Sequence, residues 1–368
     1  MSRNILHLMG MDSTKYGGIE RFNIELSRQL TDKGFHSVFV YEEYPQVQQF
    51  VNDLLSTNAE LVVINSQKNV IKFCNNIWLL YKKYDFCLMH AHFTKARFYA
   101  IPIAVVMGIK SIFYTFHSRI DTLDKIKLHT RFWYWTMNKF CKVVSVSREI
   151  EKIAKLNWKQ IKCKTLCLGV NEIQGCKIES RKYLSIPLES IVLTCIANFN
   201  YIKGLDVLVK SIRQLVNNGD FENTLLYIIG QSDDDKNALQ QLIDELNVSK
   251  YIYLEGIKNN IHQYLLASDI YIQPSRSEGL PMALMEACSA GLPIVASRVG
   301  GIPEAAINNR NAILCEVENY IELGNNIRDL IKDFQLRQLF GIQSKKIYKE
   351  NFSIKKNVEK LVEYYDIN

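Results

Sequence analysis

The sequence has no apolar run long enough to cross a bilayer. Its longest run, 100–109, has about half of the 18 or more residues that a membrane-spanning helix needs, and Pro102 and Gly108 interrupt it. Residues 1–9 lack the basic stretch and the apolar core of a signal peptide, and 4–9 read as a first β-strand. We therefore expect a cytoplasmic protein.

Paired cysteines and low-complexity tracts are also missing. The nine cysteines are scattered without a C-x-x-C pair, which argues against a disulfide framework or a cysteine-type zinc site. His90 and His92 lack a third ligand nearby in the sequence, and the acidic run 233–235 reads as a solvated loop. We expect no metal and no cofactor.

Charge is divided unevenly along the chain. Residues 1–178 hold 25 Lys and Arg against 14 Asp and Glu, whereas residues 179–368 hold 20 against 24. A basic first half suits nucleic acid, an anionic membrane surface, a phosphorylated substrate or simply a solvated face. Because no nucleic-acid recognition motif is present, we expect no nucleic-acid partner.

Short β-branched runs alternate with helical patterns, which is typical of βαβ units around parallel sheets. The length of 368 residues favours two domains. Periodicity is lost at 173–189, so we predict an α/β chain with a domain at 1–172, a linker at 173–189, a second domain at 190–350 and a C-terminal amphipathic helix within 351–368. The predicted strands are 4–9, 37–41, 61–64, 86–90, 111–116, 142–146, 191–196, 225–229, 252–254, 270–273 and 293–296.

Two strand-loop-helix segments have the form of ligand sites, because backbone N–H groups at a helix start can meet an anion. In the first, Gly17 and Gly18 precede a helix and let a ligand approach the backbone, or merely form a turn. The spacing G-x-G-x-x-G of dinucleotide sites is absent. In the second, Lys203 and Gly204 precede the helix expected at 205–216. The ammonium of Lys203 suits a diphosphate, or it is a solvated surface group.

A third segment, 274–293, is more informative. Pro281 and Gly291 mark the start and end of a helix of about ten residues. Glu278 precedes this helix and Glu286 lies on its second turn, so both carboxylates can reach one polyhydroxylated ligand while the free amides of Gly279 and Leu280 donate to it. The alternative is that these acidic groups only complement the helix dipole.

The motifs of this segment resemble the donor-site signature of glycosyltransferase family 4, the retaining enzymes of GT-B fold. The resemblance rests on Ser277-Glu-Gly-Leu-Pro281, Glu286-Ala287, Gly291-Leu-Pro293 and Gly300-Gly-Ile-Pro-Glu304. Supporting matches extend over nearly the whole chain, at Gly17-Gly-Ile-Glu20, His90-Ala-His92, Thr115-Phe-His117, Ser145-Val-Ser147, Lys203-Gly204 and Leu254-Glu-Gly256.

The resemblance implies two Rossmann-like parallel-sheet domains that face each other across a cleft, the first for the acceptor and the second for the nucleotide sugar, with the C-terminal helix crossing back to the first. It implies that Glu286 holds the ribose and Lys203 the diphosphate. It assigns the catalytic roles to His117 and Glu278. The further donor contacts that it implies are Gly17, Gly18, Asn198, Gly204, Gly256, Gly279, Leu280 and Pro281, and the acceptor contacts are His90, His92 and Arg119.

One position departs from the family pattern. Many relatives carry an arginine five residues before the lysine of the phosphate clamp, where this chain has Asn198. A lost charge-assisted hydrogen bond costs about 1.5–3 kcal/mol, which is roughly tenfold to a hundredfold in affinity. Either activity is weak or another cation, such as Arg276 or Arg21, compensates.

The expected function is a metal-independent hexosyltransferase. It would move a hexose or N-acetylhexosamine, from a UDP-sugar first of all, to a hydroxyl of a glycan or lipid-linked acceptor in cell-surface polysaccharide synthesis. The segment 122–140 mixes basic and aromatic residues, which suits an anionic membrane at the inner face of the plasma membrane or an ordinary packed helix. A nucleotide-sugar-binding protein without catalysis and a sugar-nucleotide epimerase stay open as alternatives.

Overall fold

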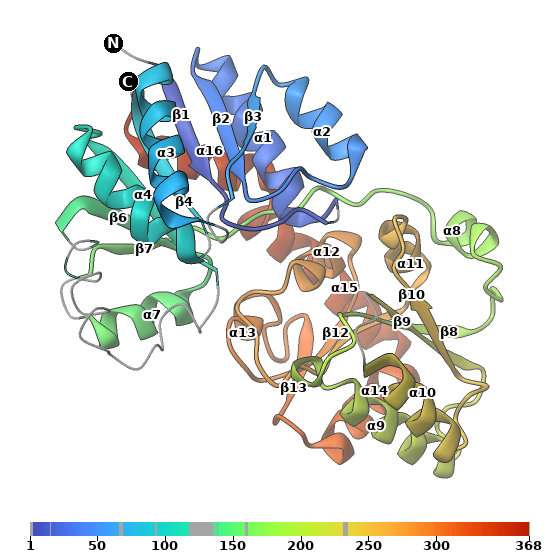
Figure 1. The fold of residues 1–368 in the computed structure, drawn as a ribbon. Helices are drawn as coiled ribbons and strands as arrows, with labels where there is room; N and C mark the ends of the chain where they lie inside the picture. Colours follow the sequence, from blue (N-terminus) through green and yellow to red (C-terminus); the bar gives the residue numbers. More distant parts are fainter. Residues whose placement is uncertain are drawn as a thin grey trace. The chain divides into compact units, whose positions relative to one another are not determined.

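The structure is a computed structural model that describes residues 3–14, 16–65, 69–92, 94–117, 135, 137, 139–158, 161–230 and 235–367. It divides into two compact units, one made of Met1–Gly169 with Ile354–Asn368 and the other of Val170–Ser353 (Figure 1). Each unit is built around a parallel sheet with helices on both faces. The prediction of two Rossmann-like parallel α/β units is confirmed.

The sheet of the first unit has seven strands in the order β3-β2-β1-β4-β5-β6-β7. The strands are β1 (Asn4–Leu8), β2 (His36–Tyr41), β3 (Glu60–Val63), β4 (Phe86–Ala91), β5 (Ser111–Phe116), β6 (Cys141–Ser145) and β7 (Cys163–Thr165). The helices are α1 (Gly18–Asp32), α2 (Gln48–Leu55), α3 (Val70–Tyr84), α4 (Thr94–Val106), α7 (Arg148–Asn157) and α16 (Ile354–Tyr365).

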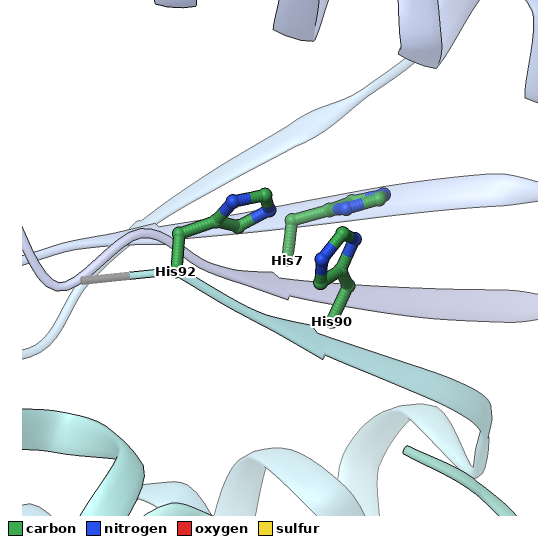
Figure 2. A group of neighbouring side chains, drawn as sticks. All are labelled: His7, His90 and His92. Carbon is green, nitrogen blue, oxygen red and sulfur yellow. The ribbon is translucent and has the colours of Figure 1, made fainter. Parts of the chain in front are cut away.

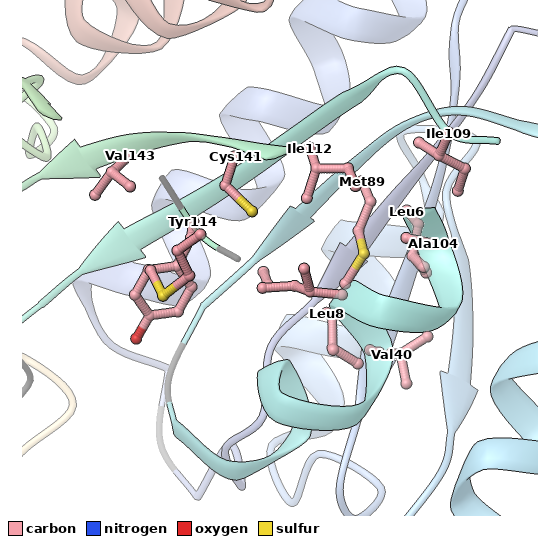
Figure 3. Packing of buried hydrophobic residues seen from close by; sticks show 14 of the residues in the cluster. Leu6, Leu8, Val40, Met89, Ala104, Ile109, Ile112, Tyr114, Cys141 and Val143 are labelled. Atoms are coloured by element: carbon pink, nitrogen blue, oxygen red, sulfur yellow. The ribbon is translucent and has the colours of Figure 1, made fainter. Parts of the chain in front are cut away.

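Strand alternation sorts the first core onto the two faces of its sheet. Leu6 and Leu8 of β1 pack with α3 and α4, in the cluster that Figure 3 shows around Met89 and Ala104. Ile5 points to the other face and packs with α1 and α16. Successive side chains of a strand alternate between faces, so one short strand contributes to both cores.

The sheet of the second unit has six strands in the order β10-β9-β8-β11-β12-β13. The strands are β8 (Ile191–Ile196), β9 (Thr224–Ile229), β10 (Ile252–Gly256), β11 (Ile270–Gln273), β12 (Ile294–Ser297) and β13 (Ala312–Cys315). The helices are α8 (Lys177–Tyr183), η1 (Tyr201–Lys203, a 3-10 turn), α9 (Leu205–Asn217), α10 (Asp235–Glu245), α11 (Ile261–Ala267), α12 (Met282–Ala290), α13 (Ile302–Ala305), α14 (Tyr320–Lys332) and α15 (Phe334–Asn351).

The segment predicted as a linker, 173–189, contains α8 and lies in the second unit. The buried side chain of Arg181 donates to Asp269 Oδ2 over 2.7 Å and to the carbonyl oxygen of Ala267 over 2.9 Å. A buried guanidinium with several acceptors holds a segment firmly. β7 and β13 are edge strands of three and four residues and are not among the predicted strands.

The C-terminal helix α16 belongs to the first unit. Its apolar side, including Val358 and Leu361, packs on α1 and on the strands that carry Ile5 and Phe113. Asn357 also donates from Nδ2 to the carbonyl oxygen of Leu168 over 3.3 Å. The last helix therefore completes a core whose other elements come from the first 169 residues.

We expect Leu361→Ala to destabilise the first unit by about 2–5 kcal/mol, because it leaves a cavity under α16. Urea unfolding, with hydrogen exchange of the β1 amides, measures the effect. Glu359→Ala on the exposed side of the same helix is the control and should change little. Equal stability of the two variants would contradict the packing role of α16.

Candidate functional site

The second unit holds a polar cluster at the carboxyl ends of β8 and β11. The chain turns to one side of β8 to make β9 and β10 and to the other side to make β11, β12 and β13. Open α/β sheets bind ligands at this kind of switch point, outside the carboxyl ends of the strands. Lys203 follows β8 and Glu278 follows β11, so both predicted donor residues lie at the switch point.

Lys203 and Glu278 form a direct ion pair. Lys203 Nζ lies 2.6 Å from Glu278 Oε1, and the Glu278 side chain is only 9% exposed. The same oxygen accepts hydrogen bonds from Ser275 Oγ over 2.8 Å and Gln273 Nε2 over 3.2 Å. Three donors on one carboxylate oxygen hold it in a single position.

Behind this pair lies a fully buried phenol. Tyr271 donates to Gln273 Oε1 over 2.7 Å, and Gln273 in turn donates to Ser275 Oγ over 2.8 Å. Burial raises the pKa of Tyr271 well above its ordinary value, and the nearby charges of Cys195, Glu278 and Glu286 add to the effect. Tyr271 is therefore a neutral hydroxyl that supports Gln273, one of the donors to Glu278.

Sequence reasoning missed this supporting chain. Tyr271, Gln273 and Ser275 occupy alternate positions at the end of β11, so they share one face. A polar residue at every second position of an otherwise apolar strand was the available signal. It identifies a face of the sheet but not the partner that the face meets.

Arg276 lies beside the cluster and holds the turn that carries Lys203. Its guanidinium, 12% exposed, donates to both carboxylate oxygens of Asp206 over 2.8 and 2.9 Å. It also donates to Glu318 over 2.7 Å and to the carbonyl oxygen of Tyr201 over 2.6 Å, and it stacks on the Tyr201 ring. The backbone N–H of Arg276 donates to the carbonyl oxygen of Ile202 over 2.7 Å.

Because of these contacts, Arg276 is a poor candidate to replace the missing phosphate-binding arginine. Burial of Asp206 opposes its charged form, but the pairing with Arg276 outweighs burial and holds the pKa of this carboxyl below its ordinary value. The hydrogen bond to Asp206 raises the pKa of Arg276 further. The guanidinium is thus committed to two carboxylates and to the backbone of η1.

Two glycines are required by close backbone contacts. Gly204 ends η1 at φ 64°, and a Cβ there would lie 2.1 Å from the carbonyl oxygen of Pro274. Gly300 has φ 59°, and its Cβ would lie 1.9 Å from the carbonyl oxygen of Glu278. No side chain fits at either position. The glycines let two neighbouring loops close on the backbone of 274–278.

The helix after Glu278 is close to the predicted one. α12 spans Met282–Ala290, with Pro281 as its N-cap and Gly291 at φ 79° as its C-cap. The loop before it is braced by Gly301, whose N–H donates to the carbonyl oxygen of Gly279 over 2.6 Å. The half-buried Glu286 lies within α12, as predicted.

Three other predicted donor residues lie in this unit. Leu280 is buried, which suits a backbone role better than a side-chain contact. Gly256 adopts φ 68° at the end of β10, with no atoms within 4 Å of where a Cβ would be. Asn198 is partly buried, and its carbonyl oxygen accepts from the N–H of Asn200 over 2.9 Å.

The first unit holds the remaining predicted residues. Gly17 is the N-cap of α1, and its N–H donates to Glu20 Oε2 over 3.0 Å. The other carboxylate oxygen of Glu20 accepts from Ser13 Oγ over 2.9 Å, which fixes the loop that leads to Gly18. Sequence reasoning quoted Glu20 only as part of a motif and missed this capping role.

The predicted histidines of the first unit lie together. His92 Nδ1 is 3.2 Å from His117 Nε2. Burial lowers the pKa of His117 well below its ordinary value, and the neighbouring His92 lowers it further. His90 is fully buried and both of its ring nitrogens contact hydroxyls, so it does not face a surface pocket. Arg119, residues 233 and 234 of the acidic run, and most of 122–140 lie outside the described residues.

Two family models match the chain, one after the other. The model of Glycosyltransferase Family 4 matches residues 16–171, and the model of glycosyl transferases group 1 matches residues 177–347. Between them they cover both units. The chain belongs to this family of GT-B glycosyltransferases.

Curated relatives are distant and differ in coverage. N-acetyl-alpha-D-glucosaminyl L-malate synthase of Bacillus anthracis is 27% identical over 188 residues, which is 51% of this chain and 48% of that protein. The chain thus spans about half the length of this relative and of several others. A second relative is UDP-Gal:alpha-D-GlcNAc-diphosphoundecaprenol alpha-1,3-galactosyltransferase of Escherichia coli. It is 20% identical to this chain, and the alignment covers 95% of this chain and 93% of the Escherichia coli protein.

Solved structures show the same fold over the full chain. A glycosyltransferase from Rickettsia africae has a TM-score of 0.85 at 21% identity and covers 99% of this chain and 98% of its own. Anabaena HepE in complex with UDP and glucose has a TM-score of 0.84 at 18% identity and covers 100% of both chains. At these identities the likeness shows the fold alone.

Among the helices in the described part of the chain, none is both long and apolar enough to cross a membrane.

We expect Arg276→Lys to loosen the turn that carries Lys203, because an ammonium cannot replace the two-pronged contact with Asp206. Loss of these charge-assisted bonds should cost about 1.5–3 kcal/mol in the unfolding of the second unit. Hydrogen exchange should rise in the amides of 201–204. The control Arg298→Lys alters an exposed pair at 3.7 Å and should have almost no effect. Unchanged exchange in η1 would contradict the positioning role.

Proposed function

We propose that the protein is a retaining glycosyltransferase that moves a hexose or N-acetylhexosamine from a UDP-sugar to a hydroxyl of a glycan or lipid-linked acceptor. The observation that carries the proposal is the ion pair of Lys203 and Glu278 at the switch point of the second sheet. It places a cation and a carboxylate side by side where such sheets bind nucleotides. Membership of a glycosyltransferase family supports the same reading.

Lys203 supplies the cation for the donor diphosphate in this proposal. Breaking a glycosyl bond leaves charge on the departing nucleoside diphosphate, and a fixed ammonium stabilises that charge as it develops. Lys203 is held near its place by Glu278 and by the turn that Arg276 clamps. We therefore propose that diphosphate departure uses Lys203 and requires no metal ion.

The two carboxylates divide the remaining contacts. Glu278 accepts hydrogen bonds on Oε1 from protein donors, and we assign its other oxygen to the hydroxyls of the transferred sugar. Glu286 on α12 is assigned to the ribose. The roles toward the donor that family resemblance implies for Gly18 and His117 remain predictions.

The choice of UDP and of the acceptor rests on relatives. HepE was solved with UDP and glucose, and the Escherichia coli relative is a galactosyltransferase named for UDP-Gal and a diphosphoundecaprenol-linked acceptor. We propose a similar role in the synthesis of cell-surface polysaccharide, in the cytoplasm at an anionic membrane surface. An excess of basic residues in 1–178 supports that location.

We expect Lys203→Ala to lower kcat/KM for the donor about tenfold to a hundredfold, because one charge-assisted contact to the diphosphate is lost. Release of UDP in the presence of acceptor measures the rate. Lys182→Ala removes an exposed lysine of α8 and should leave the rate unchanged. If Lys203→Ala turns over at the wild-type rate, the phosphate assignment fails. Donor consumption without acceptor would point to epimerase chemistry instead.

Glu286→Ala should abolish the rise in melting temperature that UDP causes, since it removes the carboxylate that accepts hydrogen bonds from the ribose hydroxyls. A thermal-shift panel of UDP-, GDP- and ADP-sugars tests both the site and the donor class. Glu245→Ala on exposed α10 serves as the control variant. A full UDP shift in Glu286→Ala would exclude the assigned ribose contact.

A further inference from the structure

Three histidines meet at the switch point of the first sheet. β2 and β3 lie on one side of β1 in the sheet, and β4 to β7 lie on the other, so the strand order reverses between β1 and β4. His7 of β1 and His90 of β4 are register partners, and His92 follows two residues later. Because partners in register and residues two apart share a face, the three imidazoles lie on the side covered by α1 and α16. Figure 2 shows the rings grouped over β1 and β4.

The three rings offer nitrogen atoms to a common point. One ring nitrogen from each histidine lies within 4.8 Å of the corresponding nitrogen of the other two. A tetrahedral zinc ion with Zn–N distances of about 2.0–2.1 Å places its ligating nitrogens roughly 3.4 Å apart. The proposed ion would have to draw the three nitrogens into that range.

Two of the histidines have unused ring nitrogens in the core. His7 is 0% exposed, and neither of its nitrogens has a hydrogen-bond partner in the described residues. The same holds for His92 Nε2. A buried polar atom without a partner has lost its hydrogen bonds to water with nothing in their place. Three such atoms in one cluster are therefore expensive unless a bound species takes them up.

Two hydroxyl groups already fix the orientation of the His90 ring, as hydrogen-bond partners of metal-binding histidines do. His90 Nδ1 lies 2.6 Å from the hydroxyl of Tyr365, and its Nε2 lies 2.7 Å from Thr115 Oγ1. On binding a metal, His90 would exchange one of these two hydroxyl contacts for the ion. Its other ring nitrogen would keep its hydroxyl partner. A second hydrogen bond of this kind fixes the tautomer and the direction of a ligating imidazole.

Aromatic packing also limits the movement of the His7 ring. The stacking of His7 on Phe39, with ring centroids 4.4 Å apart, limits how far its ring can turn away.

We propose that His7, His90 and His92 form a binding site for one divalent transition-metal ion of the kind that prefers imidazole, with zinc as the representative. The fourth coordination position is left to solvent, as in other three-histidine centres. The ion would join β1 to β4 through His7 and His90. It would stabilise the first unit, and it stands apart from the diphosphate chemistry assigned to Lys203.

The test uses the full chain, stripped with a chelator and then dialysed against zinc without any sugar nucleotide. We expect about one equivalent of zinc per chain by elemental analysis, and a higher melting temperature than the stripped protein. His7→Gln should lose both. His262→Gln removes an exposed histidine of α11 in the second unit and should lose neither.

Wild-type protein that folds but takes up no zinc would overturn the proposal and favour buried solvent among the rings. So would equal zinc content in wild type and His7→Gln. Because a core variant can fail to fold, cobalt(II) loading of the wild-type chain is a second measurement. A strong visible d–d spectrum of a low-coordinate, nitrogen-bound ion supports the site, whereas a weak octahedral spectrum contradicts it. These readouts do not depend on transferase activity.

Discussion

The ion pair between Lys203 and Glu278 is the interaction on which the second unit's polar cluster depends. Each residue follows a different strand, and the pair joins the loop after β8 to the loop after β11. A carboxylate that is only 9% exposed needs a counter-charge and donors, and Lys203, Ser275 and Gln273 supply them. In return, the lysine is held where an anionic ligand can meet it. Removing either partner would leave the other charge without its ion-pair contact.

The turn around this pair is held by contacts that leave little freedom. Arg276 joins Asp206, Glu318 and the backbone of η1, while Gly204 and Gly300 admit backbone carbonyls at distances that a side chain would forbid. A preorganised site avoids the cost of ordering its loops when a ligand binds. The hypothesis that Arg276 replaces the arginine absent at Asn198 is not favoured, because its guanidinium is already committed.

The first unit places its unusual polar residues at the corresponding point of its own sheet. Histidines from β1 and β4 converge beside Phe39, and the last helix closes over them through Tyr365. An apolar core normally excludes groups that lack partners. Although His90 and His92 lie in a motif shared with the family, the three buried imidazoles are thus a chemical feature of this unit that its apolar packing does not explain.

The sequence by itself determined the α/β class, most strands to within one or two residues, the bounds of α12 and the glycosyltransferase resemblance, because strand alternation, helix caps and short motifs are local properties. It could not determine that Lys203 meets Glu278, that Arg276 clamps η1, or that His7 completes a cluster with His90 and His92. Lys203 and Glu278 are 75 positions apart, Arg276 and Tyr201 are 75 apart, and His7 is 83 or more positions from the other two histidines. Their meeting follows from strand order and register, which only the tertiary structure decides, since both depend on packing across the whole sheet.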